Sequence, residues 1–386
     1  MALMFCYGLV YAWGVVAPEV ESVERWPALL VAAVLSGNPV GWSIGVVLGG
    51  RLADRHRPRM LCCVAVAMLA TGFGIAFAFP SPASFIAGYG VLGLGMGGGF
   101  AITACLAAIR EVMPQRLGAA SGAMTSCYAL AALVEVPLVS RLDVAVGWLD
   151  ALRVVGAALL AICVIAVAVM PSLPKPTSRV ADRRPARELV LEPRLIAACL
   201  LALSIPPVGA GAFSHLGTYS ALLHMTPVVA TASLVAVAIG NFTGRFSGGA
   251  LSDRMGADQV MVLALLFDVA AAIALSSASG PVALLAGGLL AGAAFGVAYG
   301  ALPRLAATIR AGAGANFVYG LVSIGFAAGT FAGPLLVAGA GAGRTSWLFA
   351  AAAVVVGGAI VVLRRTILAG PPATSRPLYA ERRMPP

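Results

Sequence analysis

Charged residues are scarce in this sequence. Asp, Glu, Lys and Arg make up only 10% of its 386 residues, and 60% are hydrophobic. A soluble domain carries about 25% charged residues, so the composition excludes an ordinary soluble fold. The apolar residues fall in continuous runs of about 18–25 residues, each long enough to cross a bilayer as a helix. These runs do not alternate with polar residues, which argues against a transmembrane β-barrel.

Motifs typical of enzymes and metal sites are also lacking. The sequence contains no H-E-x-x-H pattern, no nucleophile elbow and no phosphate-binding loop. No two of its seven cysteines have C-x-x-C spacing, so neither a metal site nor a disulfide framework is indicated. We therefore expect no enzymatic activity and no cofactor, and we interpret the cysteines as small packing residues.

The net charge of +10 is explained by its distribution along the chain. Twenty of the 25 Lys and Arg residues lie in one set of alternating loops and tails. The opposite set holds Arg25, Arg141, Arg153 and Arg344, and Arg245 lies within an apolar run. The positive-inside rule then predicts that the basic loops and both termini are cytoplasmic. We expect a multi-pass protein of the cell (inner) membrane. No nucleic-acid partner is needed to explain the charge.

Twelve apolar runs are present, six on each side of a polar, proline-rich segment. They cover residues 3–18, 28–50, 60–79, 83–108, 117–139, 152–170, 195–222, 227–251, 260–279, 281–303, 316–339 and 344–363. We predict an all-α polytopic membrane protein with twelve transmembrane helices in two six-helix pseudo-symmetric halves. The expected boundaries are 1–170 for the N-terminal half, 171–193 for a cytoplasmic linker, 194–364 for the C-terminal half and 365–386 for a cytoplasmic tail.

The start of the chain is apolar but lacks the basic segment and the cleavage site of a signal peptide. We expect the first run to be a helix. Because it begins abruptly, the sequence leaves open whether the N-terminus is complete.

The two halves share short patterns at a constant offset. Gly49-Gly-Arg-Leu-Ala-Asp-Arg55 matches Gly248-Gly-Ala-Leu-Ser-Asp-Arg254, and the fourth and tenth runs each carry glycines four residues apart. Glycines at this spacing form a flat stripe that allows helices to approach closely. The pattern supports a duplicated fold, and it leaves open whether these faces are static or slide past one another.

Arg245 is the one Arg or Lys that lies deep inside an apolar run and not at its end. An arginine at membrane depth is costly, so it normally faces a partner, a cavity or a ligand. One guanidinium can bind one carboxylate through two parallel hydrogen bonds, and a second negative charge would remain uncompensated. The sequence therefore predicts an anion site in which Arg245 anchors a single negative charge.

Several other residues are candidates for the surroundings of this site. Phe295 and Tyr299 lie one turn apart on one helix face, where they either form the wall of a site or fill the core. Tyr11 is open to the same two interpretations. His215 follows Pro206-Pro207, which predict a break in the seventh run; it either faces a cavity or is a hydrogen-bonded packing histidine.

Two carboxylates lie inside apolar runs and are candidates for proton coupling. Glu135 is expected near the outer end of the fifth run, where it could reach water. Asp268 is expected near a packing surface of the ninth run.

The chain resembles the major facilitator superfamily. The resemblance rests on twelve runs split six and six, with G-x-x-x-D-R after the second run of each half. It implies a secondary transporter that works by alternating access, usually as a monomer. In that superfamily these loops help to latch the outward-open state, and the gate residues it implies here are Gly50, Asp54, Arg55, Gly249, Asp253 and Arg254. The first copy departs from the family pattern, because Arg57 stands where a glycine is expected.

Within the superfamily, the chain looks most like oxalate:formate antiporters and monocarboxylate transporters. The similar stretches begin at Tyr11, Gly93, Pro114, Asn241 and Asn316. The resemblance implies that Arg245 binds a substrate carboxylate with Asn241 beside it. Ile324 aligns with a lysine that provides the second cation for oxalate, which argues against a dianion. Asn241 aligns with the aspartate of proton-coupled monocarboxylate carriers, which puts the usual proton site in doubt.

The sequence is compatible with two functions. The leading hypothesis is transport of a small organic monoanion, a monocarboxylate, with a coupling proton or a counter-anion. The alternative is proton-coupled efflux of drugs or metabolites, dependent on Glu135 or Asp268. A sensor or scaffold without transport is disfavoured by the short tail after Arg365. The exact substrate, the direction of transport and the coupling ion stay open.

Overall fold

The computed structural model describes residues 1–171, 173, 191–310 and 314–339. The N-terminal part contains α1 (Ala2–Cys6), η1 (Tyr7–Ala12), α2 (Trp13–Ser22), α3 (Ala28–Ala53), α4 (Pro58–Ala78), α5 (Pro82–Ser84), η2 (Phe85–Met96), α6 (Gly97–Val112), η3 (Pro114–Arg116), α7 (Leu117–Val146) and α8 (Trp148–Val169). The C-terminal part contains α10 (Pro193–Ser204), α11 (Pro206–Leu222), α12 (Pro227–Met255), α13 (Ala257–Ser276), α14 (Pro281–Ile309) and α15 (Ala315–Gly339). Within these residues every regular element is a helix, as the sequence predicts.

Ten helical segments of the described chain are long and apolar enough to cross a membrane. Three of them are composite: α1, η1 and α2 form the first, α5, η2 and α6 the fourth, and α10 and α11 the seventh. The expected break in the seventh run is present, because α10 ends at Ser204 and α11 begins at Pro206. With α7, a 30-residue helix in the same bundle, eleven of the twelve expected spans are seen. The twelfth, at 344–363, the tail and most of the linker lie outside the described residues.

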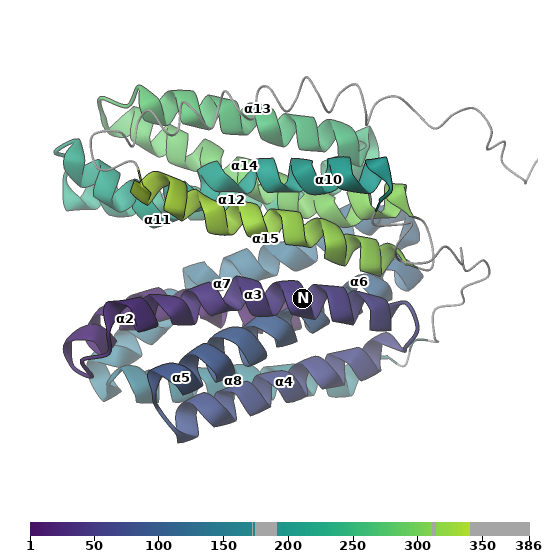
Figure 1. Ribbon diagram of the computed structural model, residues 1–386, viewed down its shortest axis with the longest axis horizontal. Coiled ribbons are helices and arrows are strands. Elements are labelled where there is room, and N and C mark those ends of the chain that lie inside the picture. The colour runs from purple at the N-terminus through teal and green to yellow at the C-terminus, as the bar shows by residue number, and fades with distance from the viewer. Residues whose placement is uncertain (172, 174–190, 311–313, 340–386) are drawn as a thin grey trace, which may run out of the picture.

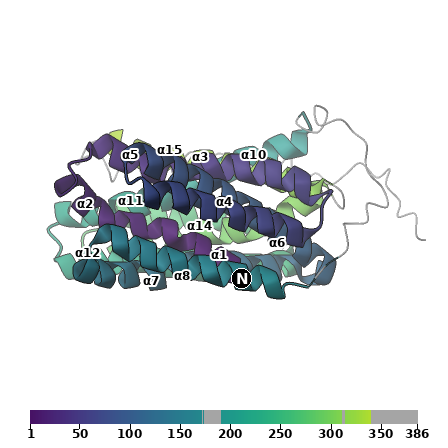
Figure 2. The ribbon, with the colours of Figure 1, turned by 90° about the horizontal axis from the view of Figure 1, so that it is seen from below.

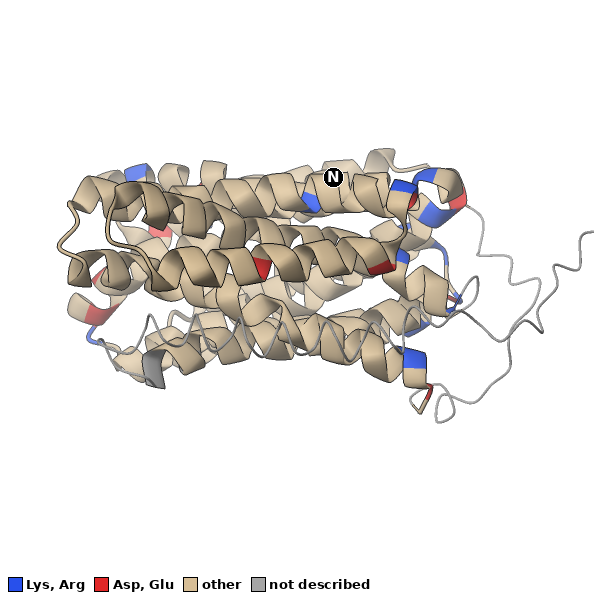
Figure 3. Ribbon diagram, turned by 90° about the horizontal axis from the view of Figure 1, so that it is seen from above, with Lys and Arg blue, Asp and Glu red and all other residues tan. Residues whose placement is uncertain are grey.

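The helices form two groups that lie side by side along one long axis (Figures 1 and 2). The helices up to α8 make one half, and α10 to α15 make the other. The halves contact each other mainly through two pseudo-equivalent pairs, α3 with α15 and α7 with α12, and α7 also contacts α14. Lys, Arg, Asp and Glu gather at the two ends of the bundle, and the helices between the ends are almost free of charge (Figure 3). This distribution fits a bundle whose middle is surrounded by lipid.

The predicted glycine stripes are packing faces within the C-terminal half. A Cβ atom added at Gly240, Gly244 or Gly248 of α12 would overlap the backbone of α14. Gly292 and Gly296 of α14 face the backbone of α12 in the same way. The absence of side chains here lets two helix backbones touch.

Aromatic side chains fill the core of the N-terminal half. Trp13 contacts Phe85, Tyr89 and Trp148, with ring centroids 5.4–6.4 Å apart. Its indole Nε1–H donates to the carbonyl of Val31 at 2.9 Å. Trp13 is therefore a core residue with its polar atom satisfied.

Candidate functional site

Arg245 lies in the interior of the bundle, where it joins the two halves. Its side chain on α12 is only 3% exposed. The Nε–H group donates to Oδ1 of Asn241, one turn earlier on the same helix, at 2.9 Å. The Nη1 group donates to the carbonyl of Thr125 on α7, in the other half, at 3.3 Å. Arg245 lies in the middle of its helix, whereas Arg110, which also has buried guanidinium atoms, lies near the end of α6.

Three aromatic rings surround the guanidinium. Its Cζ atom lies 4.1 Å from the ring centroid of Tyr299, 5.7 Å from that of Tyr128 and 6.0 Å from that of Phe295. Tyr128 belongs to the N-terminal half and the other two rings to the C-terminal half. Cation–π attraction of this kind partly offsets the cost of burying the charge. We call Arg245, Asn241 and these three rings the central site.

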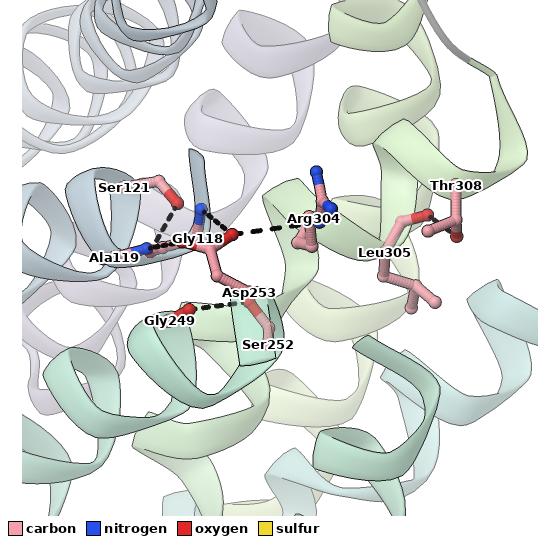
Figure 4. A network of polar contacts seen from close by, with 9 residues as sticks. All are labelled: Gly118, Ala119, Ser121, Gly249, Ser252, Asp253, Arg304, Leu305 and Thr308. Atoms are coloured by element: carbon pink, nitrogen blue, oxygen red, sulfur yellow. Dashed lines mark hydrogen bonds and ion pairs between the residues drawn. The ribbon is translucent and has the colours of Figure 1, made fainter. Parts of the chain in front are cut away.

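At one end of the bundle, Asp253 binds the start of a helix in the opposite half (Figure 4). Its Oδ1 accepts from the backbone N–H of Gly118 at 2.9 Å, and its Oδ2 accepts from that of Ala119 at 2.8 Å. Both N–H groups belong to the first turn of α7, where a carboxylate is stabilised by the helix dipole. Arg304 of α14 lies 3.8 Å from Oδ1. We call these contacts the second latch.

Asp54 makes the pseudo-equivalent contact. Its Oδ1 accepts from the side-chain amide of Asn316 at 3.0 Å, and its Oδ2 accepts from the backbone N–H of Phe317 at 3.2 Å. These donors begin α15, in the other half. Arg110 of α6 donates to Oδ1 of the same Asn316. Burial raises the pKa of the Asp54 carboxyl, and the two N–H donors and Arg110 oppose that rise. We call these contacts the first latch.

Residues 1–308 of the chain match the sequence family described as the Major Facilitator Superfamily. The chain belongs to the major facilitator superfamily. It is thus a multi-pass membrane transporter with a fold used for secondary active transport of small molecules.

Two solved structures of the fucose transporter FucP share this transporter's fold. One is FucP in the outward conformation, with a TM-score of 0.69, 16% identity, and coverage of 95% of this chain and 98% of that chain. The other is a variant of the E. coli fucose:proton symporter FucP, with a TM-score of 0.73, 15% identity, and coverage of 94% and 96%. No curated protein matches the sequence significantly.

The structure brings together most of the residues expected around Arg245. Asn241, Phe295 and Tyr299 contact it directly, and Tyr11 lies one ring further away, with its centroid 5.4 Å from that of Tyr128. Tyr128 itself was not predicted, since nothing in the fifth run marks which of its faces points inward.

His215 has a different environment. Its Nε2 atom lies 3.1 Å from the carbonyl oxygen of Pro334 on α15. A contact of this kind agrees with the second interpretation, a hydrogen-bonded packing histidine, and the side chain is half-buried. The described contacts of the transporter do not join His215 to Arg245.

Ile324, which the resemblance aligns with the lysine that provides a second cation, is 42% exposed. The buried positions of α15 include Tyr319, Ser323 and Phe326. Since α15 contains no charged residue, it provides no second cation in any register of this alignment.

Glu135 lies deeper than expected. The fifth run was predicted to end at residue 139, but α7 continues to Val146, which leaves Glu135 about three turns inside the helix. Its side chain is 2% exposed, and neither carboxylate oxygen has a hydrogen-bond partner among the described residues. The interpretation that it reaches water at the outer end is therefore wrong. Asp268 is also completely buried, on the face of α13 that packs inward, and its oxygens likewise lack a described partner.

The residues implied by the family motif divide into two groups. Asp54, Asp253, Gly50 and Gly249 lie at the latches, with Gly50 against the backbone of Asn316 and Gly249 against those of Gly118 and Gly122. Arg55 and Arg254 are exposed and make none of the described latch contacts. The arginines at the latches are Arg110 and Arg304, which follow the fourth and tenth runs and were not predicted as gate residues.

Replacing Asp253 by Asn is expected to weaken the second latch. The Asn side chain has one acceptor oxygen for the two N–H donors and lacks the negative charge that a helix start favours. We expect the closed latch to be less stable by about 1 kcal/mol. The transport rate should change severalfold at unchanged protein level. Asp150→Asn is the matched control, since Asp150 pairs with Arg153 on an exposed surface. Equal rates for natural protein and Asp253→Asn would contradict a latch at this position.

Proposed function

We propose that this transporter carries a small organic monoanion, a monocarboxylate, by alternating access between its two halves. The observation that supports this proposal is Arg245, a buried basic side chain in the interior of the bundle that contacts both halves. A guanidinium matches the geometry of a carboxylate. In a low-dielectric site, one cation balances one negative charge and leaves a dianion uncompensated.

Substrate binding would affect the contact between the halves. Arg245 donates to Thr125 of the opposite half, and a bound carboxylate would compete for the same guanidinium donors. A Cβ at Gly122, one turn before Thr125 on α7, would overlap the Arg245 carbonyl and Gly249. The anion site and the second latch therefore share one α7–α12 seam, and occupancy of one would change the stability of the other.

We assign the latch end of the bundle to the cytoplasm. The motif arginines Arg51 and Arg55 are at this end, and the loops that contain them belong to the set rich in basic residues. This orientation places both termini and the linker in the cytoplasm of a cell with the protein in its inner membrane. The proposed working unit is a monomer.

Counterflow in proteoliposomes tests the substrate class. Vesicles loaded with an unlabelled monocarboxylate should accumulate the labelled monocarboxylate, while vesicles loaded with oxalate should not. Counterflow needs no coupling ion, so its result does not depend on whether protons or counter-anions drive transport. Exchange of oxalate at an equal rate, or exchange of no anion by folded protein, would overturn the proposal.

Glu135 is proposed as a proton-coupling group. An ionised carboxylate without a partner is very costly in an apolar interior, so the protonated form is favoured there. Glu135→Gln keeps a neutral side chain of similar shape and should leave counterflow and folding intact. It should reduce accumulation driven by a pH gradient at least tenfold, as measured by radiolabelled uptake. The control variant is Glu21→Gln, because Glu21 is exposed. If Glu135→Gln still accumulates substrate in response to a pH gradient, Glu135 is not the proton-coupling group.

Proton-coupled efflux of drugs or metabolites is the second candidate function. Two buried carboxylates without described partners, Glu135 and Asp268, favour it. It predicts that expression lowers drug susceptibility, that Asp268→Asn or Glu135→Gln reverses this, and that Arg245→Ala does not. Loss of the phenotype in the arginine variant would argue for the anion carrier.

A further inference from the structure

The central site is bordered by two sets of rings, one from each half, which we call the aromatic arcs. The N-terminal arc contains Tyr11, Trp42 and Tyr128, and the C-terminal arc contains Phe295, Tyr299 and Phe326. Neighbouring rings within each arc have centroids 4.8–5.5 Å apart. Each arc reaches Arg245, the first through Tyr128 and the second through Tyr299 and Phe295. The guanidinium is thus placed between two aromatic walls that belong to opposite halves.

The rings of the arcs are not completely enclosed. Trp42, Tyr128, Phe295 and Tyr299 each keep 7–9% of their surface exposed. By contrast, Tyr89 in the N-terminal core is 0% exposed. The rings beside Arg245 therefore keep a small exposed surface in both halves, unlike the rings of the N-terminal core.

We propose that the transported anion is an aryl monocarboxylate, of the benzoate type, with its carboxylate on Arg245 and its ring between the arcs. This inference rests on the proposed function and specifies its substrate class. All four ring contacts within the arcs are edge-to-face, with interplanar angles of 63–73°. Aromatic quadrupoles favour edge-to-face and offset contacts, so a further flat ring fits such walls better than a saturated ring of equal size.

The position of the arcs also links substrate shape to the transport cycle. A ligand ring held by both arcs contacts both halves, whereas a short acid such as acetate reaches Arg245 and leaves the arcs uncovered. The ring therefore adds apolar burial and aromatic contacts that acetate lacks. We expect benzoate to bind at least about tenfold more tightly than acetate or cyclohexanecarboxylate.

Thermal stabilisation of the purified protein measures this selectivity, because a ligand that binds the folded state raises its melting temperature. The probes are benzoate, cyclohexanecarboxylate, acetate and benzyl alcohol. The two variants, Phe326→Leu and Phe331→Leu, both change a phenylalanine of α15. Phe326 contacts Phe295 and Tyr299 of the C-terminal arc, whereas Phe331 is 51% exposed and serves as the control. Phe326→Leu should weaken benzoate binding about tenfold and acetate binding little, and Phe331→Leu should change neither.

The outcomes separate this inference from the proposed function. Benzoate binding that is strongest in the series and sensitive to Phe326→Leu supports it. If acetate or cyclohexanecarboxylate binds as tightly as benzoate, the proposal of a monocarboxylate carrier is kept and the proposal of an aryl substrate is rejected. If benzyl alcohol binds and no carboxylate does, both the monocarboxylate carrier and the aryl substrate are rejected. The ligand series on the natural protein decides between these results even if Phe326→Leu does not fold.

Discussion

Replacing Arg245 by Ala is expected to lower monocarboxylate binding and transport by a factor of about 100 or more. Truncating one partner of a desolvated, hydrogen-bonded charge pair costs about 2–5 kcal/mol, and each 1.4 kcal/mol is a factor of ten. Arg245→Lys keeps the charge but loses the planar fork and the Nε–H bond to Asn241. Since a single ammonium group cannot reproduce two parallel bonds, we expect about tenfold weaker binding for this variant.

The measurement is radiolabelled uptake at matched protein level in the membrane. Ligand-free Arg245→Ala should melt close to the natural protein, because the substitution removes a buried charge that has no ionic partner among the described residues. Arg141→Ala, at an exposed position on α7, is the control and should transport normally. Normal monocarboxylate transport by Arg245→Ala would show that the anion binds elsewhere.

Replacing Gly249 by Val is expected to keep the second latch from closing. Even a single Cβ at this position would meet the Gly118 carbonyl and lie 2.6 Å from the Cα of Gly122, both on α7. Backbone atoms cannot move aside as a flexible side chain can, and overpacking of this kind costs about 1–3 kcal/mol. The cost applies only to the closed state, so it shifts the equilibrium toward the open latch about tenfold to a hundredfold. Net transport should fall by a similar factor, because the cycle needs both states.

Opening of the latch can be measured with a thiol placed in it. Ser252 is 1% exposed and donates to the Gly249 carbonyl, so Ser252→Cys in a background without natural cysteines places a protected thiol at the seam. A water-soluble maleimide should label this thiol much faster when Gly249→Val is also present. Gly74→Val is the control, since a Cβ at Gly74 meets no atom within 4 Å. Equal labelling rates in both variants would rule out steric opening.

The general architecture follows from local properties of the sequence. Long apolar runs with few charges can only be helices in a bilayer, since every backbone polar group must be satisfied within its own segment. The repeated G-x-x-x-D-R motif and the glycine stripes indicate two related halves from the sequence alone. Arg245 can also be identified from the sequence, because a charged residue in the middle of an apolar run is rare and costly.

Prediction failed where the question was which way a side chain faces. Tyr128 contacts Arg245, although nothing in the sequence marks it as a site residue, and Ile324, aligned with a lysine of related transporters, is 42% exposed. In a membrane helix both the lipid side and the core side are apolar, so hydrophobic periodicity does not separate them as it does in a soluble helix. The depth of Glu135 was wrong for a related reason, since α7 continues beyond the apolar run that defined its predicted end.

The sequence by itself determined the helical membrane fold, the duplication, the positions of the motif aspartates and the buried arginine. Only the tertiary structure decided which residues meet: Asp54 and Asp253 with helix starts in the opposite half, Arg110 and Arg304 as the arginines at the latches, and the aromatic arcs around Arg245. The physical reason is that helix formation in a bilayer is set by hydrogen bonds and apolar runs within each segment. Contacts between helices depend on how two faces far apart in sequence fit together.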